Sequence, residues 1–188
     1  MTRKILVTAA LPYLNNIPHL GHIAGSHLPA DITYRFHRSR GQDAVFVGGS
    51  DEHGTPNILS AKRQGIGMQE FCDKMHAYHE EVYKKFGIGY TNYSRTSRPL
   101  HHKTTQEFFK KLNSNGLTKV QETEQYFCKK ESVFLPDRYV VGVCPSCGVA
   151  GAHGDQCEHC SSFVENNLID AKCTNCEGEA SLKRTKHL

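Results

Sequence analysis

Cysteines carry the clearest chemistry in this sequence, because six of the eight fall into three C-x2-C pairs. The pairs are Cys144/Cys147, Cys157/Cys160 and Cys173/Cys176. A C-x2-C turn points two thiolates at one ion, and two such turns complete the closed tetrahedral set of a structural zinc site. Nine residues separate the first two pairs, and this short gap favours a site made of Cys144, Cys147, Cys157 and Cys160.

The third pair is left over by this assignment. Cys128 lies nearby, and Glu131 follows it at the spacing that the second thiol of a C-x2-C pair would have. Cys128, Cys173 and Cys176 are therefore candidates for a second site, and the alternative is a vestigial knuckle with free thiols. Cys72 lies on a predicted helix face and is expected to be a core residue.

Two histidines flank a glycine at a predicted helix start, in His19-Leu-Gly-His22. Free backbone N–H groups and the helix dipole favour an anionic phosphate at such a position. Gly21 would allow a ligand to approach the backbone closely, and two imidazoles can donate hydrogen bonds to phosphate oxygens. The motif therefore favours nucleotide binding, and the alternative is a pair of surface histidines around a helix cap.

A carboxylate follows the second predicted strand, in Ser50-Asp-Glu-His-Gly-Thr-Pro56. Ligands of open parallel sheets bind at the carboxyl ends of the strands. We therefore expect Asp51 to face the same crevice as the histidines, where it would pair with a substrate ammonium group. The alternative is that Asp51 only caps a helix or closes a turn.

The histidines and Asp51 must be positioned by the two apolar runs that precede them, residues 4–10 and 43–49, which we predict to be strands. Continuous apolar runs are typical of strands that are covered on both faces. Helices are predicted between and after them, so the strand-helix-strand-helix order indicates an α/β fold with a parallel sheet. Short β-rich runs follow Gly116 and lead into the cysteines.

Helix signals lie between these runs. One apolar face is predicted at Ile23, Leu28, Ile32 and Phe36. Pro29 should kink or split this helix. Thr55-Pro56 opens a second helix that extends to about Gln64. Amphipathic helices are also predicted over residues 68–86 and 100–114.

Composition excludes several classes of protein. The chain has 188 residues, 38% hydrophobic and 22% charged, which suits a folded core and excludes disordered and collagen-like chains. No stretch approaches the roughly 20 apolar residues of a membrane span and no signal peptide is apparent, so we expect a cytoplasmic protein. Neither the P-loop nor the dinucleotide glycine fingerprint occurs. A net charge of +4 permits an anionic partner.

Four ordered motifs make the chain resemble the N-terminal portion of the methionyl-tRNA synthetases, a family of class I aminoacyl-tRNA synthetases. The motifs are Ala10-Leu-Pro-Tyr13 with His19-Leu-Gly-His22, then Asp51-Glu-His-Gly-Thr-Pro56, then Tyr93-Ser-Arg-Thr-Ser97, then Phe134-Leu-Pro-Asp-Arg138 ahead of Cys144. The resemblance implies ATP-dependent activation of methionine to methionyl-adenylate, with Mg²⁺ accompanying the ATP, and transfer to tRNA(Met).

The resemblance also implies roles for individual residues. His19 and His22 match catalytic histidines that stabilise the transition state at the α-phosphate, and Gly21 belongs with them to the ATP site. The positions that match methionine-binding residues are Leu11, Pro12, Tyr13 and Asp51. The first two cysteine pairs match the usual structural zinc site of the family.

The resemblance implies two domains. Residues 1–117 are expected to form the first half of a Rossmann-like nucleotide-binding domain, and residues 118–188 a truncated β-rich insertion with zinc knuckles. The family's Lys-Met-Ser-Lys-Ser loop has no counterpart here. We therefore expect the remainder of a synthetase chain as a partner, and no adenylate formation by these residues alone.

Two other functions compete with this interpretation. A zinc module that binds nucleic acid would use the knuckles and nearby lysines without chemistry of its own. A nucleotidylyltransferase for a small metabolite would share the H-x-G-H helix start.

Overall fold

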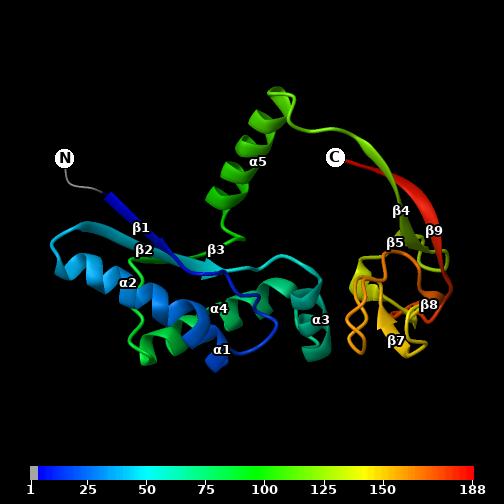
Figure 1. Cartoon of the computed structure of the whole chain (residues 1–188), viewed down its shortest axis with the longest axis horizontal. Helices are drawn as coiled ribbons and strands as arrows, with labels where there is room; N and C mark the ends of the chain where they lie inside the picture. The colour runs from blue at the N-terminus through cyan, green and yellow to red at the C-terminus, as the bar shows by residue number, and fades with distance from the viewer. Residues whose placement is uncertain (1–3) are drawn as a thin grey trace. The chain divides into compact units, whose positions relative to one another are not determined.

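Figure 1 shows the computed structural model, which describes residues 4–188. They form two compact units, one up to Lys110 and one from Lys111 to Leu188. The division falls within α5 (Pro99–Ser114), a few residues before the predicted domain boundary at 117/118. Gly116, with φ of 68°, ends that helix. We keep 117/118 as the proposed boundary because it lies in the connection between the end of α5 at Ser114 and the next strand, which begins at Gln121.

A parallel sheet organises the first unit. It consists of β1 (Lys4–Thr8), β2 (Asp43–Ser50) and β3 (Asn92–Arg95) in the order β1-β2-β3. Both strand pairs are parallel, with Val7 opposite Phe46 and Gly48 opposite Tyr93. The predicted α/β fold with a parallel sheet is thereby confirmed, although the third strand was not predicted from the sequence.

Helices cover one face of this sheet (Figure 1). Val7 and Phe46 are buried on that face, together with Tyr83 of α4 (Met68–Lys85). On the other face, the side chain of Leu6 is 65% exposed and that of Val45 is 39% exposed. The prediction that both faces are covered is therefore wrong for the described residues. An apolar run predicts a hydrophobic strand, but it cannot show whether the layer that would cover each face is present.

The helical run after β1 is split into three parts. These are α1 (Leu20–His22), a π-helix (Ile23–His27) and α2 (Leu28–Ser39). The predicted split is confirmed, and Pro29 lies in the first turn of α2. A π-helix is often found at functional sites. Here its Ser26 hydroxyl accepts a hydrogen bond from the backbone N–H of Ala10, just beyond β1, at 3.1 Å.

The predicted apolar face of this run is wrong beyond Ile23. Ile32 and Phe36 are 58% and 55% exposed, whereas His27 and Asp31 are buried. The buried face is thus displaced by about one residue. The sequence could not indicate this because the two residues that occupy it are polar, and each is buried only because tertiary hydrogen bonds satisfy it.

The remaining helices of the first unit follow the sequence closely. Helix α3 covers Thr55–Gln64, and Gly65 ends it with φ of 67°. Cys72 of α4 is 3% exposed, so its prediction as a core residue is confirmed. Helix α5 has no buried residue, and its Leu100 is 73% exposed. Among the described residues, no helix combines the length and apolar composition that crossing a membrane requires.

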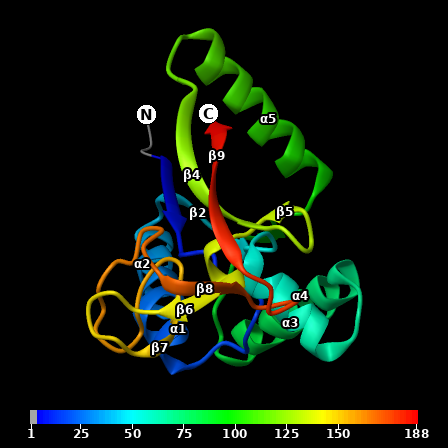
Figure 2. The same ribbon diagram turned by 90° about the vertical axis from the view of Figure 1, so that its right-hand side faces the viewer.

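The second unit consists of two small antiparallel sheets (Figure 2). The first sheet has the order β5-β4-β9 and is formed by β4 (Gln121–Cys128), β5 (Val133–Phe134) and β9 (Ala180–His187). The second has the order β7-β6-β8 and is formed by β6 (Val140–Val143), β7 (Ala150–His153) and β8 (Ile169–Cys173), after a 3-10 helix over Asp137–Tyr139.

The core of the second unit is small and rich in cysteine. Tyr126, Leu135, Val140 and Val164 are buried in it, and so are several of the cysteines. Because so few large apolar side chains are buried, a unit of this size needs additional cross-links for stability.

Candidate functional site

The ends of β1 and β2 bring the predicted methionine-binding residues together. The backbone N–H of Asp51 donates to the carbonyl of Pro12 at 2.9 Å, and Tyr13 and Asp51 form a parallel bridge. The side chain of Leu11 lies against β2, because a Cβ on Gly49 would stand 3.3 Å from it. This adjacency follows from the parallel sheet, in which both strands end at the same edge.

The carboxylate of Asp51 is half-buried and partly used by the turn that carries it. Its Oδ1 accepts a hydrogen bond from the backbone N–H of His53 at 3.2 Å. The backbone carbonyl oxygen of Asp51 accepts a hydrogen bond from the side chain of Asn57 at 2.9 Å. The turn role that the sequence left open is therefore present. It does not exclude binding of an ammonium group, since a carboxylate has further lone pairs to offer.

Apolar surface borders this carboxylate. Leu11 is 54% exposed and Tyr13 is 47% exposed, whereas Pro12 is buried. Large apolar side chains at this level of exposure can cover a ligand at modest cost, since they already face solvent. The edge of the sheet thus offers an anionic group beside an apolar surface.

His19 and His22 form the cap of the helical run that starts at Leu20. The Nδ1 of His19 accepts from the backbone N–H of Gly21 at 3.1 Å, and the Nδ1 of His22 accepts from the N–H of His19 at 3.3 Å. The rings stack with their centroids 3.9 Å apart. A Cβ on Gly21 would lie 2.9 Å from the His19 ring, so this arrangement requires glycine. The helix-cap role, which the sequence left as an alternative, is thus present.

This cap also fixes the tautomers of the two rings. A ring whose Nδ1 accepts a hydrogen bond carries its proton on Nε2 when neutral. Burial, together with the charge of His19, lowers the pKa of His22, so His22 is neutral at pH 7. Each ring therefore has an Nε2–H group with which to donate to an acceptor.

A buried carboxylate that the sequence analysis assigned no role lies beside Asp51. Glu52 is 2% exposed, and its Oε1 accepts hydrogen bonds from Arg95 Nε at 2.6 Å and Ser50 Oγ at 3.0 Å. Ser97 also donates to this carboxylate. The backbone N–H of Glu52 donates to Thr96 Oγ1 at 2.9 Å.

These contacts connect two of the sequence motifs. The turn after β2 is held to the Tyr93–Ser97 segment through both the side chain and the backbone of Glu52. Arg95 in turn pairs with Asp73 of α4 at 2.6 Å. Because Glu52 precedes His53 and follows Asp51, this network fixes the turn that carries the Asp51 carboxylate. The sequence offered one sign of this network, because Glu52 and Arg95 stand at the ends of neighbouring strands, where opposite charges can pair.

A second group that the sequence analysis missed is a buried histidine among tyrosines. His27 is 2% exposed, its Nε2 lies 3.1 Å from the hydroxyl of Tyr83, and its Nδ1 is hydrogen-bonded to the hydroxyl of Tyr90. Burial, reinforced by the charges of His22 and His79, lowers the pKa of His27 to about 4. His27 is therefore a neutral core residue at pH 7.

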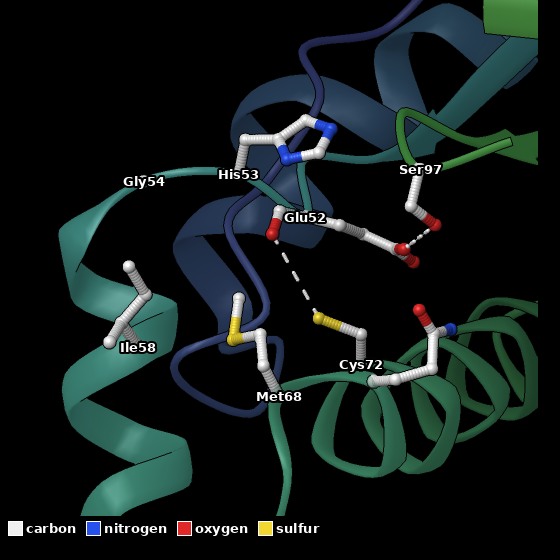
Figure 3. A pocket seen from close by; sticks show the side chains of 8 residues that line it. Glu52, His53, Gly54, Ile58, Met68, Cys72 and Ser97 are labelled. Atoms are coloured by element: carbon white, nitrogen blue, oxygen red, sulfur yellow. Dashed lines mark hydrogen bonds between the residues drawn. The ribbon is translucent and has the colours of Figure 1, made fainter. Parts of the chain in front are cut away.

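A cavity of about 210 Å³ lies on another side of the turn after β2 (Figure 3). Its lining consists of Glu52, His53, Gly54, Ile58, Met68, Gln69, Cys72 and Ser97. In Figure 3 the Cys72 thiol points towards the Glu52 carbonyl, and the Ser97 hydroxyl points towards the Glu52 carboxylate. None of the predicted methionine-binding residues lines this cavity, so we assign it no part in the site.

The first two C-x2-C pairs form one cluster, which we call the four-cysteine cluster. It contains Cys144, Cys147, Cys157 and Cys160, whose sulfur atoms all lie within 4.8 Å of one another. Two sulfur pairs are each 3.8 Å apart, Cys144 with Cys160 and Cys147 with Cys157. Four thiolates about 2.3 Å from one tetrahedral ion stand roughly 3.8 Å apart, so this cluster fits zinc.

The remaining cysteines form a second group, which we call the three-cysteine cluster. It contains Cys128, Glu131, Cys173 and Cys176, and its ligand atoms also lie within 4.8 Å of one another. The structure thus brings together the three cysteines that the sequence proposed as a second site. The two clusters are compatible with zinc knuckles.

Comparison with known proteins places the chain in a family. The family model described as "tRNA synthetases class I (M)" matches residues 5–188. A methionine–tRNA ligase of Korarchaeum cryptofilum is 45% identical over 183 residues, which cover 97% of this chain and 33% of that protein. A methionine–tRNA ligase of Rubrobacter xylanophilus is 44% identical over 188 residues, which cover 100% of this chain and 33% of that protein.

The fold has close counterparts among solved structures. Methionyl-tRNA synthetase of Mycobacterium tuberculosis in complex with methionyl-adenylate has a TM-score of 0.67 at 17% identity, covering 98% of this chain and 31% of the other. At this identity the likeness concerns the fold alone. The chain spans about a third of the length of the curated relatives it matches.

Proposed function

The chain belongs to the class I tRNA synthetases of the methionine type, and on this premise we propose that it contributes to ATP-dependent activation of methionine and its transfer to tRNA(Met). Residues 1–117 would supply the first half of the nucleotide-binding domain, and residues 118–188 an insertion held by zinc. The rest of a synthetase chain would complete the ATP site. A cytoplasmic location is part of this proposal, and it is supported by the reducing environment that metal-binding thiolates need.

The observation that carries the proposal is the pair of Nε2–H donors at the helix start. Because both Nδ1 atoms are committed to the cap, His19 and His22 present their remaining donors without a tautomer change. The helix dipole adds positive potential at the same place. Preorganised donors of this kind stabilise charge that develops on phosphate oxygens in a transition state.

The proposed reaction starts with the substrates held in line. A carboxylate oxygen of methionine attacks the α-phosphorus of ATP, the bond to the leaving pyrophosphate breaks, and methionyl-adenylate forms. His19 and His22 donate to oxygens of the α-phosphate, next to Gly21. Mg²⁺, as part of the ATP substrate, would supply neutralisation of phosphate charge. A hydroxyl group of tRNA then attacks the activated carbonyl and releases AMP.

Methionine would be held at the edge of the sheet. The Asp51 carboxylate pairs with the substrate ammonium group, and Leu11, Pro12 and Tyr13 line the thioether side chain. An apolar, polarisable surface suits a thioether. The hydrogen bond between the main chains of Pro12 and Asp51 fixes the two halves of this site next to each other.

The four-cysteine cluster would hold a structural zinc ion. Its four thiolates leave no open coordination position, which excludes a catalytic role for that ion. Zinc there would supply the cross-link that the small core of the second unit lacks.

A pyrophosphate-exchange assay tests the proposal. We would replace the corresponding third of the Korarchaeum cryptofilum ligase with residues 1–188 and measure methionine-dependent exchange of pyrophosphate into ATP. In this chimera, Asp51→Ala should cost roughly 2–5 kcal/mol of binding or transition-state energy, because it removes the partner of a desolvated ammonium group. Asp51→Asn should be nearly as damaging.

The matched control is Asp43→Asn, which changes an exposed aspartate at the opposite end of β2 and should leave exchange unchanged. Wild-type exchange in the Asp51 variants would reduce Asp51 to a turn residue. The 188-residue chain alone should show no exchange. A rate equal to that of the chimera would show that the Lys-Met-Ser-Lys-Ser loop, which this chain lacks, is not needed for exchange. Neither a nucleic-acid module nor a metabolite nucleotidylyltransferase accounts for a family match over residues 5–188.

A further inference from the structure

The three-cysteine cluster differs from its neighbour in one ligand, and that difference is the basis of a second inference. Glu131 takes the position of the second thiol in a knuckle turn that starts at Cys128. The backbone N–H of Glu131 donates to the Cys128 sulfur at 3.4 Å, as expected of a turn that directs both side chains to one point.

Distances within the cluster fit a single ion. The Glu131 Oε2 lies 3.8 Å from the Cys173 sulfur, and the sulfurs of Cys128 and Cys176 lie 3.4 Å apart. With zinc–sulfur bonds near 2.3 Å and zinc–oxygen bonds near 2.1 Å, tetrahedral geometry gives roughly 3.6 Å between oxygen and sulfur and roughly 3.8 Å between sulfurs. The carboxylate is therefore at ligand distance.

Burial and charge also favour an ion here. Cys128 and Cys173 are 0% and 1% exposed, Cys176 is half-buried, and the Glu131 carboxylate closes the cluster from the solvent side. Three thiolates and one carboxylate leave a charge of −2 around a divalent ion. Lys129 and Lys130 lie in the same turn, and Lys130 Nζ donates to the Cys176 carbonyl at 3.3 Å.

We propose that the three-cysteine cluster binds a second zinc ion through three thiolates and the Glu131 carboxylate, and that this ion exchanges faster than the ion of the four-cysteine cluster. Zinc is the ion that soft thiolates select in a tetrahedral set. Glu131 is exposed, whereas the three sulfurs are largely shielded, so water has access to the carboxylate arm. Release would begin by exchange of this oxygen for water.

The two ions would cross-link different parts of the second unit. The four-cysteine cluster joins the segment after β6 to the segment after β7, whereas the three-cysteine cluster joins the end of β4 to the turn between β8 and β9. Loss of the exchangeable ion would therefore loosen the base of the β4–β9 pair and leave the other knuckles intact.

Metal content and release kinetics test this inference on the 188-residue chain, without reference to methionine activation. We expect two zinc ions per chain and a biphasic release to a chromogenic chelator. Glu131→Ala should accelerate the fast phase by about 10-fold or more, or lose that ion on purification. Glu131→Cys should slow the fast phase towards the slow one. Cys157→Ser should remove only the slow phase.

Cobalt provides a second measurement, because its sulfur charge-transfer bands grow with the number of cobalt–sulfur bonds. Glu131→Cys should raise their intensity, whereas Glu124→Ala, at an exposed position of β4, should change neither intensity nor release. One zinc ion per chain with Cys128 open to alkylation would overturn the second site. Unchanged release and cobalt spectra in Glu131→Cys would overturn Glu131 as a ligand, even if Glu131→Ala failed to fold.

Discussion

Acidification should destabilise the first unit through one buried histidine. The pKa of His27 falls from its ordinary value of 6.5 to about 4 in the folded chain, chiefly because of burial. Between these two values the unfolded chain binds a proton that the folded chain does not bind, so the free energy of unfolding falls as the pH falls. The contribution is complete above pH 6.5 and is lost progressively towards pH 4.

The size of this effect follows from the gap between the two pKa values. Each pH unit within that gap is worth about 1.4 kcal/mol, so the full loss is about 3 kcal/mol. His27→Gln removes the titration but leaves the hydroxyls of Tyr83 and Tyr90 with a poorer partner. We therefore expect this variant to be less stable than wild type at pH 7.5 by roughly 1–3 kcal/mol, and the difference to shrink as the pH falls.

Urea denaturation with zinc present, followed by far-UV circular dichroism, measures this effect. The helical signal reports the first unit, because the described α-helices lie in it or begin in it. His101→Gln, at an exposed position of α5, is the matched control and should follow the wild-type pH dependence. A stability difference between wild type and His27→Gln that stays constant from pH 7.5 to pH 4.5 would refute the assignment of acid sensitivity to His27.

Three further variants and one treatment have defined outcomes. Glu52→Gln should destabilise the first unit by roughly 1.5–3 kcal/mol, since it weakens a buried acceptor of three hydrogen bonds and leaves Arg95 with Asp73 as its only ion-pair partner among the described residues, and unchanged thermal unfolding would contradict the network. Gly48→Ala should lower the melting temperature, because its Cβ would lie 2.3 Å from the ring of Tyr90, whereas Gly25→Ala, with nothing within 4 Å, should raise stability by up to about 1 kcal/mol. Strong chelation should unfold the second unit and expose Cys144 to alkylation, and purified protein that contains no zinc would argue against a structural metal.

The sequence predicted those parts of the fold whose signals are local. Apolar runs located β1 and β2, and Thr55-Pro56 located the start of α3. The sequence did not predict β9. Most of this strand is exposed on both faces, so its sequence lacks the alternation of apolar and polar residues that indicates a strand. The buried face of α2 was missed because His27 and Asp31 are polar residues that only tertiary partners make compatible with burial.

The candidate site divides in the same way. The adjacency of Pro12 and Asp51 could be predicted, because parallel strands end at one edge of a sheet. The spacing of Cys128 and Glu131 already suggested a knuckle turn before any distance was known. The central place of Glu52 could not be predicted, because it depends on contacts with residues more than forty positions away.

The pairing of β4 with β9 has a consequence for protein engineering. Gln121 lies opposite His187, so the strand that enters the second unit and the strand that leaves it are neighbours in one antiparallel ladder. Their ends are therefore separated by only about 5 Å. A two-residue turn can span such a gap, so the stretch between them can be exchanged as a cassette, either cut back to a hairpin or replaced by another module whose ends meet at the same spacing.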